Sequence, residues 1–313
     1  MTIDVKKNWG ESDIPDQTGK VVFISGANIG LGYEAARMLS GRGARVLMAC
    51  RDAAKAADAI KSIQRLHPGA KLDFVPLDLA DLNQVVTVPE KVRALGVGAI
   101  DVLLNNAGVM MPPKRLETKQ GFEIEFGVNH LGHFALTRGL YGMLAPDARI
   151  VTVASLADRR GDINWDDLQW ERSYNPSAAY GQSKTANLLF TLALTEKLRA
   201  VQSGKRAVAA HPGIAMTNLA TSSTLGSWLW LVKPLVALGI GPKVQKPAMG
   251  ALPEVYGAVG EIEAGAYYGP SERVYGPPVR AESHKAPHSS NLEAANRLWT
   301  LSEQLTGGAF VVS

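Results

Sequence analysis

Cysteine is nearly absent from this sequence, and neither sign of charge dominates it. Cys50 is the only cysteine among 313 residues, so no internal disulfide can form and a reducing, cytoplasmic location is expected. The 33 basic and 29 acidic residues leave a net charge of +4, and no run of five basic residues occurs. Because nucleic-acid binding normally needs a basic stripe, we expect no nucleic-acid partner.

Long apolar segments are also missing. The first ten residues are charged and lack the apolar core of a secretory signal. The most apolar stretch, 225–241, is 17 residues long and is interrupted by Lys233 and Pro234. A spanning helix needs about 20 mostly apolar residues, so we expect no transmembrane segment. Three roles stay open for this stretch: covering a substrate, packing in the core or at a subunit interface, and touching a membrane peripherally.

What the sequence does contain is a regular alternation of short apolar runs and longer segments with helical spacing. Strands are expected at 20–25, 45–50, 71–76, 101–105, 149–154 and 205–210. Helices are expected at 29–42, 53–66, 82–95, 120–144, 177–201 and 291–304. Apolar strands that alternate with helices form βαβ units around a parallel sheet. The predicted fold is therefore α/β, a Rossmann-type doubly wound parallel sheet with helices on both faces.

After His211 the alternation gives way to frequent proline and glycine. A last strand is possible at 266–268, and the four prolines between 269 and 287 indicate irregular structure there. With no linker and no repeat, we expect one domain over 1–313. Its core should span about 18–268, with a substrate-covering segment at about 217–247 and a C-terminal helical extension at 269–313.

The first strand–helix turn reads SGANIGLG over residues 25–32. Glycines there let the backbone approach a pyrophosphate, which the N–H groups and the dipole of the following helix would bind. A glycine cluster by itself is equally typical of a tight turn. The residues expected to contact a cofactor in this turn are Gly26, Asn28, Ile29, Gly30, Leu31 and Gly32.

The glycine spacing resembles the fingerprint of the short-chain dehydrogenase/reductase family, with Ser25 where threonine is usual. Further matches follow in the family's order: an NNAG segment at 105–108, a strand-end serine, and a Tyr-x-x-x-Lys pair at the start of a long helix. The resemblance covers about residues 18 to 260. It implies a catalytic set of Asn129, Ser155, Tyr180 and Lys184, and an oxidoreductase activity.

Tyr180 must exchange a proton near neutral pH, although free tyrosine has a pKa of about 10. Lys184 lies four residues further along the same helix, so its charge is expected to lower that pKa. The resemblance implies that Lys184 also binds the nicotinamide ribose, that Ser155 holds the substrate oxygen and that Asn129 holds a water in a proton relay. In reduction, Tyr180 would protonate the substrate oxygen.

Cofactor choice depends on the end of the second strand. NAD-binding folds place an acidic residue there, about 20 residues after the glycines, but this chain has Cys50 followed by Arg51. Arginine can bind a 2′-phosphate, so NADP(H) is expected over NAD(H); the alternative is that Arg51 is only a solvated residue. The resemblance implies further cofactor contacts at Asp78, Leu79, Asn106, Ala107, Gly108, Pro212, Gly213, Ile214 and Thr217, together with Tyr180 and Lys184.

Several strings resemble one branch, the retinol dehydrogenase-like and WW-domain oxidoreductase-like proteins. They are VNHLGHF at 128–134, INWDDL at 163–168 and the LWxxS pattern at 298–302. The sequence departs from that branch in having no anchoring helix before the glycines and no WW module. We therefore expect a hydrophobic or bulky ketone or aldehyde and its alcohol, without assigning a retinoid. The tryptophans and leucines of 225–241 suggest the same substrate class.

The function class and the oligomeric state stay open. A non-catalytic NADP(H)-binding regulator on the same fold is the alternative to an enzyme, and an interfacial membrane enzyme is a third reading.

His130 and His133 have a spacing that could ligate zinc, but no cysteine or further histidine lies near them, so no metal is expected. His211 is interpreted as a strand-end residue that sets the Pro–Gly turn. The resemblance favours a dimer or tetramer through the two long helices, while the C-terminal extension would favour a monomer.

Overall fold

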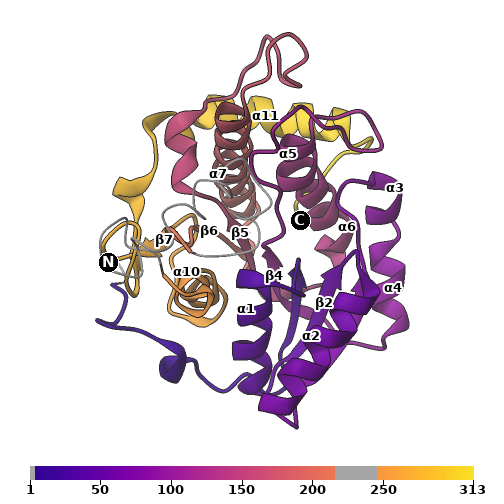
Figure 1. The fold of residues 1–313 in the computed structure, drawn as a ribbon, viewed down its shortest axis with the longest axis vertical. Coiled ribbons are helices and arrows are strands. Elements are labelled where there is room, and N and C mark those ends of the chain that lie inside the picture. Colours follow the sequence, from indigo (N-terminus) through magenta and orange to yellow (C-terminus); the bar gives the residue numbers. More distant parts are fainter. Residues whose placement is uncertain (1–3, 216–244) are drawn as a thin grey trace.

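The computed structural model describes residues 4–215 and 245–313, which form one domain (Figure 1). The expected cofactor contact Thr217 and the stretch 225–241 lie outside the described residues. No helix in those two ranges is long and apolar enough to cross a membrane.

An eight-stranded sheet crosses the centre of the molecule in the order β3-β2-β1-β4-β5-β6-β7-β8. Adjacent strands run parallel up to β7, and β8 is antiparallel to β7. The strands are β1 (Val21–Ser25), β2 (Arg45–Cys50), β3 (Lys71–Pro76), β4 (Ile100–Asn105), β5 (Leu144–Val153), β6 (Arg206–Ala210), β7 (Tyr267–Pro270) and β8 (Pro278–Arg280). The doubly wound fold is confirmed.

Helices cover both faces of the sheet. The α-helices are α1 (Gly30–Gly41), α2 (Ala53–Leu66), α3 (Leu82–Val85), α4 (Val88–Ala94), α5 (Ile124–Phe126), α6 (His133–Leu140), α7 (Pro176–Ala200), α10 (Pro247–Val259) and α11 (Leu292–Leu305). A π-helix, η2 (Gly127–Gly132), joins α5 to α6. Short 3-10 helices are η1 (Glu11–Asp13), η3 (Tyr141–Met143), η4 (Leu156–Arg160), η5 (Glu282–His284) and η6 (Pro287–Ser290).

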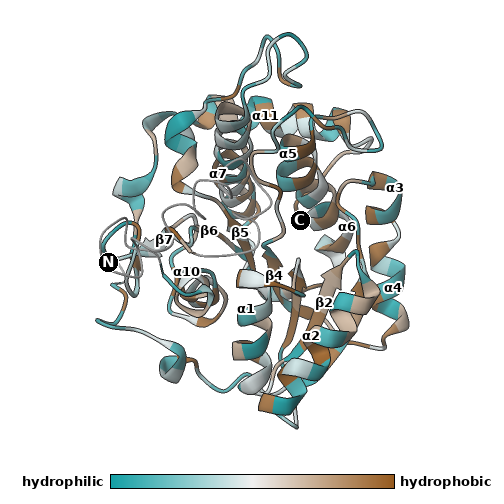
Figure 2. Ribbon diagram, viewed as in Figure 1, coloured by the Kyte–Doolittle hydropathy of each residue, from teal (hydrophilic) through white to brown (hydrophobic). Residues whose placement is uncertain are grey.

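Alternate residues of β1 divide the core into two layers. Phe23 belongs to the core layer that includes residues of α6, α7 and α11, whereas Ile24 belongs to the layer that includes residues of α1, α2 and α10 on the opposite face. This alternation is what a sheet buried on both sides requires. Figure 2 shows hydrophilic and hydrophobic residues side by side along α2, which buries Ala59 and Ile63 and leaves its other face to solvent.

The prediction of one helix over 120–144 is wrong. Gly121 has a φ of 81° and lies in a turn closed by the bond from Thr118 N to Phe122 O. The helix therefore begins only at Ile124, and the chain enters β5 at Leu144, five residues before the strand predicted from 149. The local pattern did not reveal this boundary, because it depends on the left-handed backbone of Gly121.

Two smaller predictions also need correction. The helix expected over 82–95 is divided into α3 and α4, and Pro89 lies in the first turn of α4, where its missing N–H leaves no gap in the helix. The region 269–287, expected to be irregular, contains the short strand β8. The expected last strand at 266–268 is confirmed as β7, and its pairing with β8 extends the sheet by one antiparallel strand.

The C-terminal extension packs against the long helix α7. Trp299 of α11 stacks on Phe190 of α7 with ring centroids 5.9 Å apart, and on Phe310 of the tail at 4.9 Å. The branch-specific strings meet here as well, because His130 Nε2 lies 2.7 Å from Ser302 Oγ and the Arg297 guanidinium lies 4.0 Å from the Trp165 ring centroid. The extension is therefore part of the domain.

Candidate active site

The expected site residues gather at the carboxyl ends of the central strands. The strand order reverses between β1 and β4, and such a switch point is where doubly wound sheets bind their ligands. The nucleotide loop (residues 25–32) follows β1, and the NNAG segment follows β4. Ser155 follows β5, and the Pro212–Gly213 turn follows β6. Residues far apart in the sequence therefore meet at one edge (Figure 1).

The nucleotide loop is shaped by glycine at three positions. Gly26 and Gly30 have φ values of 70° and 61°, which side chains with a Cβ rarely adopt. A Cβ on Gly32 would lie 2.4 Å from Asn106 Nδ2 and 2.5 Å from Gly26 O. Asn106 Nδ2 instead donates a hydrogen bond of 2.8 Å to Ser25 O. The nucleotide loop and the NNAG segment are thus packed so closely that no side chain fits at Gly32.

The start of α1 fits a bound phosphate. Its N-cap residue, Ile29, is extended and makes no side-chain capping bond, so the first N–H groups of the helix have no partner from the cap. Ile29 is also 45% exposed, which leaves this turn accessible. Helix N-termini of this kind bind the pyrophosphate of dinucleotides. The geometry of this chain therefore suits a nicotinamide dinucleotide cofactor.

Ser25 connects the nucleotide loop to the helix that carries Asn129. Its Oγ accepts hydrogen bonds from the backbone N–H groups of Asn106 and Ala107, both 3.0 Å long. His133 Nε2 lies 2.8 Å from the same oxygen, and His133 Nδ1 lies 2.9 Å from Asn129 O. A carbonyl only accepts, so Nδ1 carries the proton and Nε2 accepts from Ser25. Sequence reasoning weighed His133 only as a metal ligand and missed this bridge.

The two histidines of the VNHLGHF string point to different partners. His130 bonds Ser302 and His133 bonds Ser25. Burial lowers the pKa of His130 to about 3 and that of His133 to about 4, so both are neutral at physiological pH. Their role within the described structure is to join helix α6 and η2 to α11 and to β1.

Tyr180, Lys184 and Ser155 form the centre of the site. Tyr180 and Lys184 lie one turn apart on α7, and the Lys184 Nζ is 5.6 Å from the Tyr180 ring centroid. Lys184 Nζ donates to Val153 O at 3.1 Å, which leaves further N–H groups to donate. The Ser155 hydroxyl is close enough to Tyr180 to lower the pKa of its phenol. The strand β5 and the helix α7 thereby bring three of the expected catalytic residues into contact.

Asn129 completes the set from the π-helix η2. Its Oδ1 accepts from Val109 N at 2.8 Å, and its Nδ2 donates to Val109 O and to Ser183 Oγ at 3.0 and 2.9 Å. A Cβ on Gly108 would lie 3.2 Å from Asn129 Oδ1 and 3.7 Å from Lys184 Nζ. Asn129 therefore fixes the chain after β4 beside Lys184. We refer to Asn129, Ser155, Tyr180 and Lys184, which the family resemblance predicts to be catalytic, as the catalytic centre.

The predicted lowering of the Tyr180 pKa is wrong for the protein alone. Burial raises the pKa of Tyr180, and the Ser155 hydroxyl offsets only part of that rise. Burial also lowers the pKa of Lys184 to about 8, against the opposing charges of Glu125 and Glu254. The same removal from water that isolates Tyr180 thus weakens the neighbouring charge that was expected to act on it.

The Pro–Gly turn after β6 is set by His211, as predicted. His211 Nδ1 accepts from Gly213 N at 3.2 Å, so its Nε2 carries the proton and donates to His284 Nδ1 at 2.9 Å. Gly213 has a φ of 64°, and a Cβ on Gly269 would lie 1.9 Å from His211 Nε2. Ile214, the next expected cofactor contact, is 40% exposed.

The residues expected around the adenosine end follow β2 and β3. Arg51 follows β2 and is exposed, and no carboxylate in the described ranges forms an ion pair with it. Asp52 instead caps α2 by accepting from Lys55 N. Asp78 folds back to accept from Ala80 N, and Leu79 packs against Gly132, where a Cβ would lie 2.9 Å from Leu79 O. Arg51 is thus available to a ligand.

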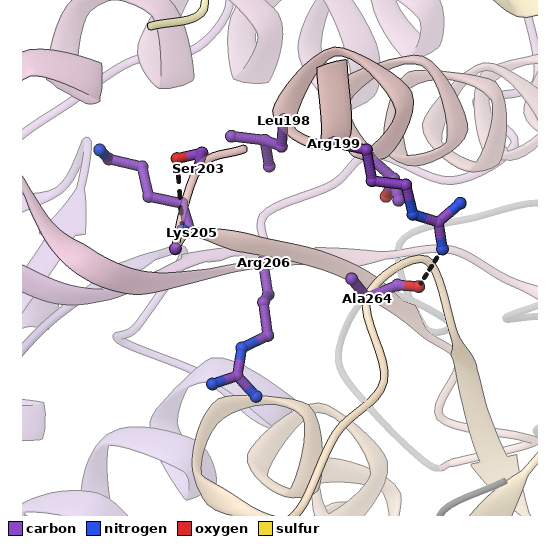
Figure 3. A pocket seen from close by; sticks show the side chains of 8 residues that line it. Leu198, Arg199, Ser203, Lys205, Arg206 and Ala264 are labelled. Carbon is purple, nitrogen blue, oxygen red and sulfur yellow. Dashed lines mark hydrogen bonds between the residues drawn. The ribbon is translucent and has the colours of Figure 1, made fainter. Parts of the chain in front are cut away.

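A pocket of about 330 Å³ lies at the other end of α7 (Figure 3). It is lined by Leu198, Arg199, Lys205 and Arg206, among others. About 18 residues of helix separate Tyr180 from Leu198, or roughly 27 Å at 1.5 Å per residue. In Figure 3 the three cationic side chains diverge from one another. The pocket is therefore not part of the candidate active site and presents no focused anion site.

The comparisons with known proteins agree with this geometry. The sequence profile described as short chain dehydrogenase matches residues 20–227. Retinol dehydrogenase 13 of Homo sapiens is 38% identical over 305 residues, covering 92% of this chain and 85% of that protein. A solved structure of a protein from Mycobacterium paratuberculosis is 37% identical, with a TM-score of 0.81 and coverage of 98% of this chain and 100% of that one.

A more distant solved structure shares the fold. The angucycline C-6 ketoreductase LanV with bound NADP is 24% identical, with a TM-score of 0.64 over 82% of this chain and 95% of that one. The profile match over more than half of the chain and the identity with retinol dehydrogenase 13 settle the family. The chain belongs to the short-chain dehydrogenases, a family of nicotinamide-dependent oxidoreductases, and within it to the retinol dehydrogenase-like branch.

Proposed function

We propose that this enzyme is an NADP(H)-dependent oxidoreductase that interconverts a hydrophobic or bulky ketone or aldehyde and its alcohol, with Tyr180 as the acid/base. The observation that carries the proposal is the meeting of Ser155, Tyr180 and Lys184 beside the nucleotide loop. A regulator that only binds the nucleotide would not require this set.

Each of these residues has a separate role in the reduction. The bound nicotinamide cofactor supplies the hydride. Ser155 holds the substrate carbonyl oxygen next to the Tyr180 hydroxyl, which gives its proton to that oxygen. Lys184 is held by Val153 O and retains N–H groups to bind the cofactor ribose. Because burial raises the pKa of Tyr180, the residue stays protonated at neutral pH, which favours reduction over alcohol oxidation.

Arg51 supports the preference for NADP(H). Its exposed guanidinium follows β2, where the 2′ position of the adenosine ribose lies in doubly wound folds. A planar guanidinium can bind a phosphate through two parallel hydrogen bonds. Cys50 cannot play the part of an acidic residue there, because burial raises its pKa to about 11 and leaves it a neutral thiol at physiological pH.

The substrate class rests on the relatives and on the sequence. Retinol dehydrogenases are named for a long apolar alcohol, and the apolar stretch 225–241 follows the Pro–Gly turn. Ile29 and Ile214 also expose apolar surface at the nucleotide loop and the Pro–Gly turn. We therefore expect bulky apolar carbonyls to react faster than short polar ones.

The test is NADPH consumption against a panel that runs from short aldehydes through aryl ketones and retinal to steroid ketones. We expect turnover of at least one bulky class, and slower turnover with NADH. If the protein binds NADPH but reduces nothing on the panel, the nucleotide-binding regulator becomes the better account.

Assembly and location remain predictions. The packing of α11 against α7 covers part of the long-helix surface, which is one observation in favour of a monomer over the expected dimer or tetramer. Light scattering at micromolar concentration distinguishes these states. Co-sedimentation with lipid vesicles tests peripheral membrane contact, and fractionation of cells tests the cytoplasmic location that the single buried thiol suggests.

A further inference from the structure

One buried carboxyl at the catalytic centre has no role in the mechanism above. Glu125 lies on the short helix α5, one turn before Asn129, and its side chain is fully buried. Its Oε1 accepts a 2.6 Å hydrogen bond from Met111 N, and its Oε2 lies 3.4 Å from the Tyr174 hydroxyl. The side chain therefore touches the chain after β4 and the segment before α7 at the same time.

The hydrogen-bond geometry accommodates a neutral carboxylic acid, because two acceptors compete for one hydroxyl proton. The Tyr174 hydroxyl lies 3.2 Å from Pro112 O, which can only accept, and it has a single proton to give. When that proton goes to Pro112, the contact with Glu125 needs a proton from Oε2. A neutral Glu125 would complete a chain in which Oε2 donates to Tyr174, Tyr174 donates to Pro112 O, and Met111 N donates to Oε1. An ionised Glu125 would instead accept the Tyr174 proton and leave Pro112 O without it.

The charges that face Glu125 also favour its neutral form. Glu123, on the preceding turn, is a second buried carboxyl, which Arg115 partly offsets, and Lys184 faces Glu125 from α7. No ion pair to Glu125 forms within the described ranges. Burial first and the charge of Glu123 second raise the pKa of Glu125 to about 8, against the opposing effects of Met111 N, Tyr174 and Lys184.

The backbone that Glu125 holds is strained and belongs to the site. Met111 has a φ of 43°, which is uncommon for a residue other than glycine and must be held by its surroundings. Val109, two residues earlier, is held by Asn129. Successive turns of α5 and η2 therefore fix the segment 108–112, which runs past Lys184 at Gly108.

We propose that Glu125 is a positioning residue that, as a neutral carboxylic acid, ties the segment 108–112 and Tyr174 to the catalytic centre. Loss of its proton draws the Tyr174 proton from Pro112 O to Oε2 and adds a negative charge that faces both Tyr180 and Lys184. That charge opposes the negative charge that develops on the substrate oxygen during reduction. The inference rests on the proposed reductase activity, and it predicts that carbonyl reduction weakens as Glu125 ionises.

Three variants test the proposal. Glu125→Gln keeps an acceptor for Met111 and a donor for Tyr174 but cannot ionise, whereas Glu125→Ala removes both bonds. Glu254→Gln is the matched control: Glu254 is a second buried acid whose charge reaches Lys184 and whose pKa burial raises to about 8, but it bonds neither Met111 nor Tyr174. The measurements are kcat/KM for the best carbonyl with NADPH, and the melting temperature, each from pH 5.5 to 9.

We expect Glu125→Gln to keep kcat/KM within threefold of the wild type at pH 6.5 and Glu125→Ala to lose at least tenfold. The ratio of Glu125→Gln to wild type should rise at least fivefold between pH 6.5 and 9. The ratio for Glu254→Gln should change much less, because the charge of Glu254 acts on Lys184 but not on Tyr180. Equal losses in both Glu125 variants with intact melting transitions, or the same pH response in Glu254→Gln, would overturn the positioning role.

The melting temperature tests the proton on Glu125 without any turnover. The unfolded carboxyl ionises near pH 4.5, while the folded one stays protonated to about pH 8. The wild type therefore loses stability relative to Glu125→Gln as the pH rises between those values, a relative shift of roughly 5 °C from pH 5.5 to 8. A constant difference in melting temperature would contradict the neutral acid. An absence of carbonyl reduction with the expected melting shift would instead count against the proposed function.

Discussion

The nucleotide loop and the catalytic centre lie at the same edge of the sheet but are built in different ways. Residues 25–32 are held by glycines, backbone groups and neutral side chains, and a Cβ at Gly32 would be only 2.4 Å from its neighbour. The catalytic centre and the positioning residue Glu125 instead bury ionisable groups, and the pKa of Lys184 and that of Glu125 are both displaced to about 8. The nucleotide loop depends on close packing without side chains, and the catalytic centre depends on the charges of buried groups. The two regions should therefore respond differently to substitution and to pH.

The largest effect that separates the two regions is expected for Gly32→Ala. The added methyl would collide with Asn106 Nδ2 and with Gly26 O, so the loop must open and NADPH binding should weaken at least a hundredfold. The loss should be the same at pH 6 and pH 9, because no titrating group is involved. Isothermal titration with NADPH measures it.

The control for this substitution is Gly69→Ala, an exposed site where a Cβ would have nothing within 4 Å. It should bind NADPH as the wild type does. A Gly32→Ala variant that binds NADPH within threefold of the wild type would show that the loop tolerates a side chain at this position. Close packing would then not be what distinguishes the nucleotide loop from the catalytic centre.

A smaller effect is expected at Arg51. Removal of the guanidinium in Arg51→Ala should weaken NADPH binding about tenfold, the size of one lost charge-assisted contact with the 2′-phosphate, and should leave NADH binding unchanged. Arg65→Ala, which removes an exposed cation at the far end of α2, is the control. Equal losses for both nucleotides would show that Arg51 does not contact the 2′-phosphate.

The smallest effect is expected for the free energy of unfolding, at the buried His130. His130 has a folded pKa of about 3, against about 6.5 when unfolded, so the unfolded chain binds more protons below pH 6.5 and the wild type loses stability as the pH falls. His130→Phe cannot bind that proton. Its stability relative to the wild type should improve by about 1.4 kcal/mol between pH 7.5 and 5.5.

Urea unfolding at the two pH values measures this change. The variant should be about 1 kcal/mol less stable at pH 7.5, because Ser302 loses its partner. Ser302→Ala, which removes the same bond but keeps the imidazole, is the control and should retain the acid sensitivity of the wild type. A His130→Phe variant that is as acid-sensitive as the wild type would show that His130 is not held neutral.

Local patterns were sufficient for much of the fold. The strands β1, β2 and β3 and the helices α1 and α2 lie where apolar runs and glycine or proline stops predicted them, because each is fixed by its own sequence. The segment 120–144 was not predictable in the same way. A left-handed glycine at Gly121 and a capping carboxyl at Glu123, which accepts from Glu125 N and Phe126 N, decide where its helix begins.

In the candidate site, too, local features were predictable and contacts between distant segments were not. Tyr180, Lys184 and the glycines were found because their spacing is short and regular. The bridge from Ser25 through His133 and the contacts of Glu125 join segments up to 108 residues apart, and no local pattern marks such pairs. The pKa of Tyr180 was mispredicted for the same reason, because burial by distant segments outweighs one neighbouring charge.

The central claim is that Tyr180 transfers the proton while the nucleotide loop binds the cofactor independently of it. The most direct measurement is NADPH binding and carbonyl reduction by Tyr180→Phe, side by side with the wild type. The account predicts NADPH binding within threefold of the wild type and a kcat lower by about a thousandfold, within the range typical of a lost general acid. A variant that binds NADPH normally and still reduces the carbonyl at more than a tenth of the wild-type rate would contradict it.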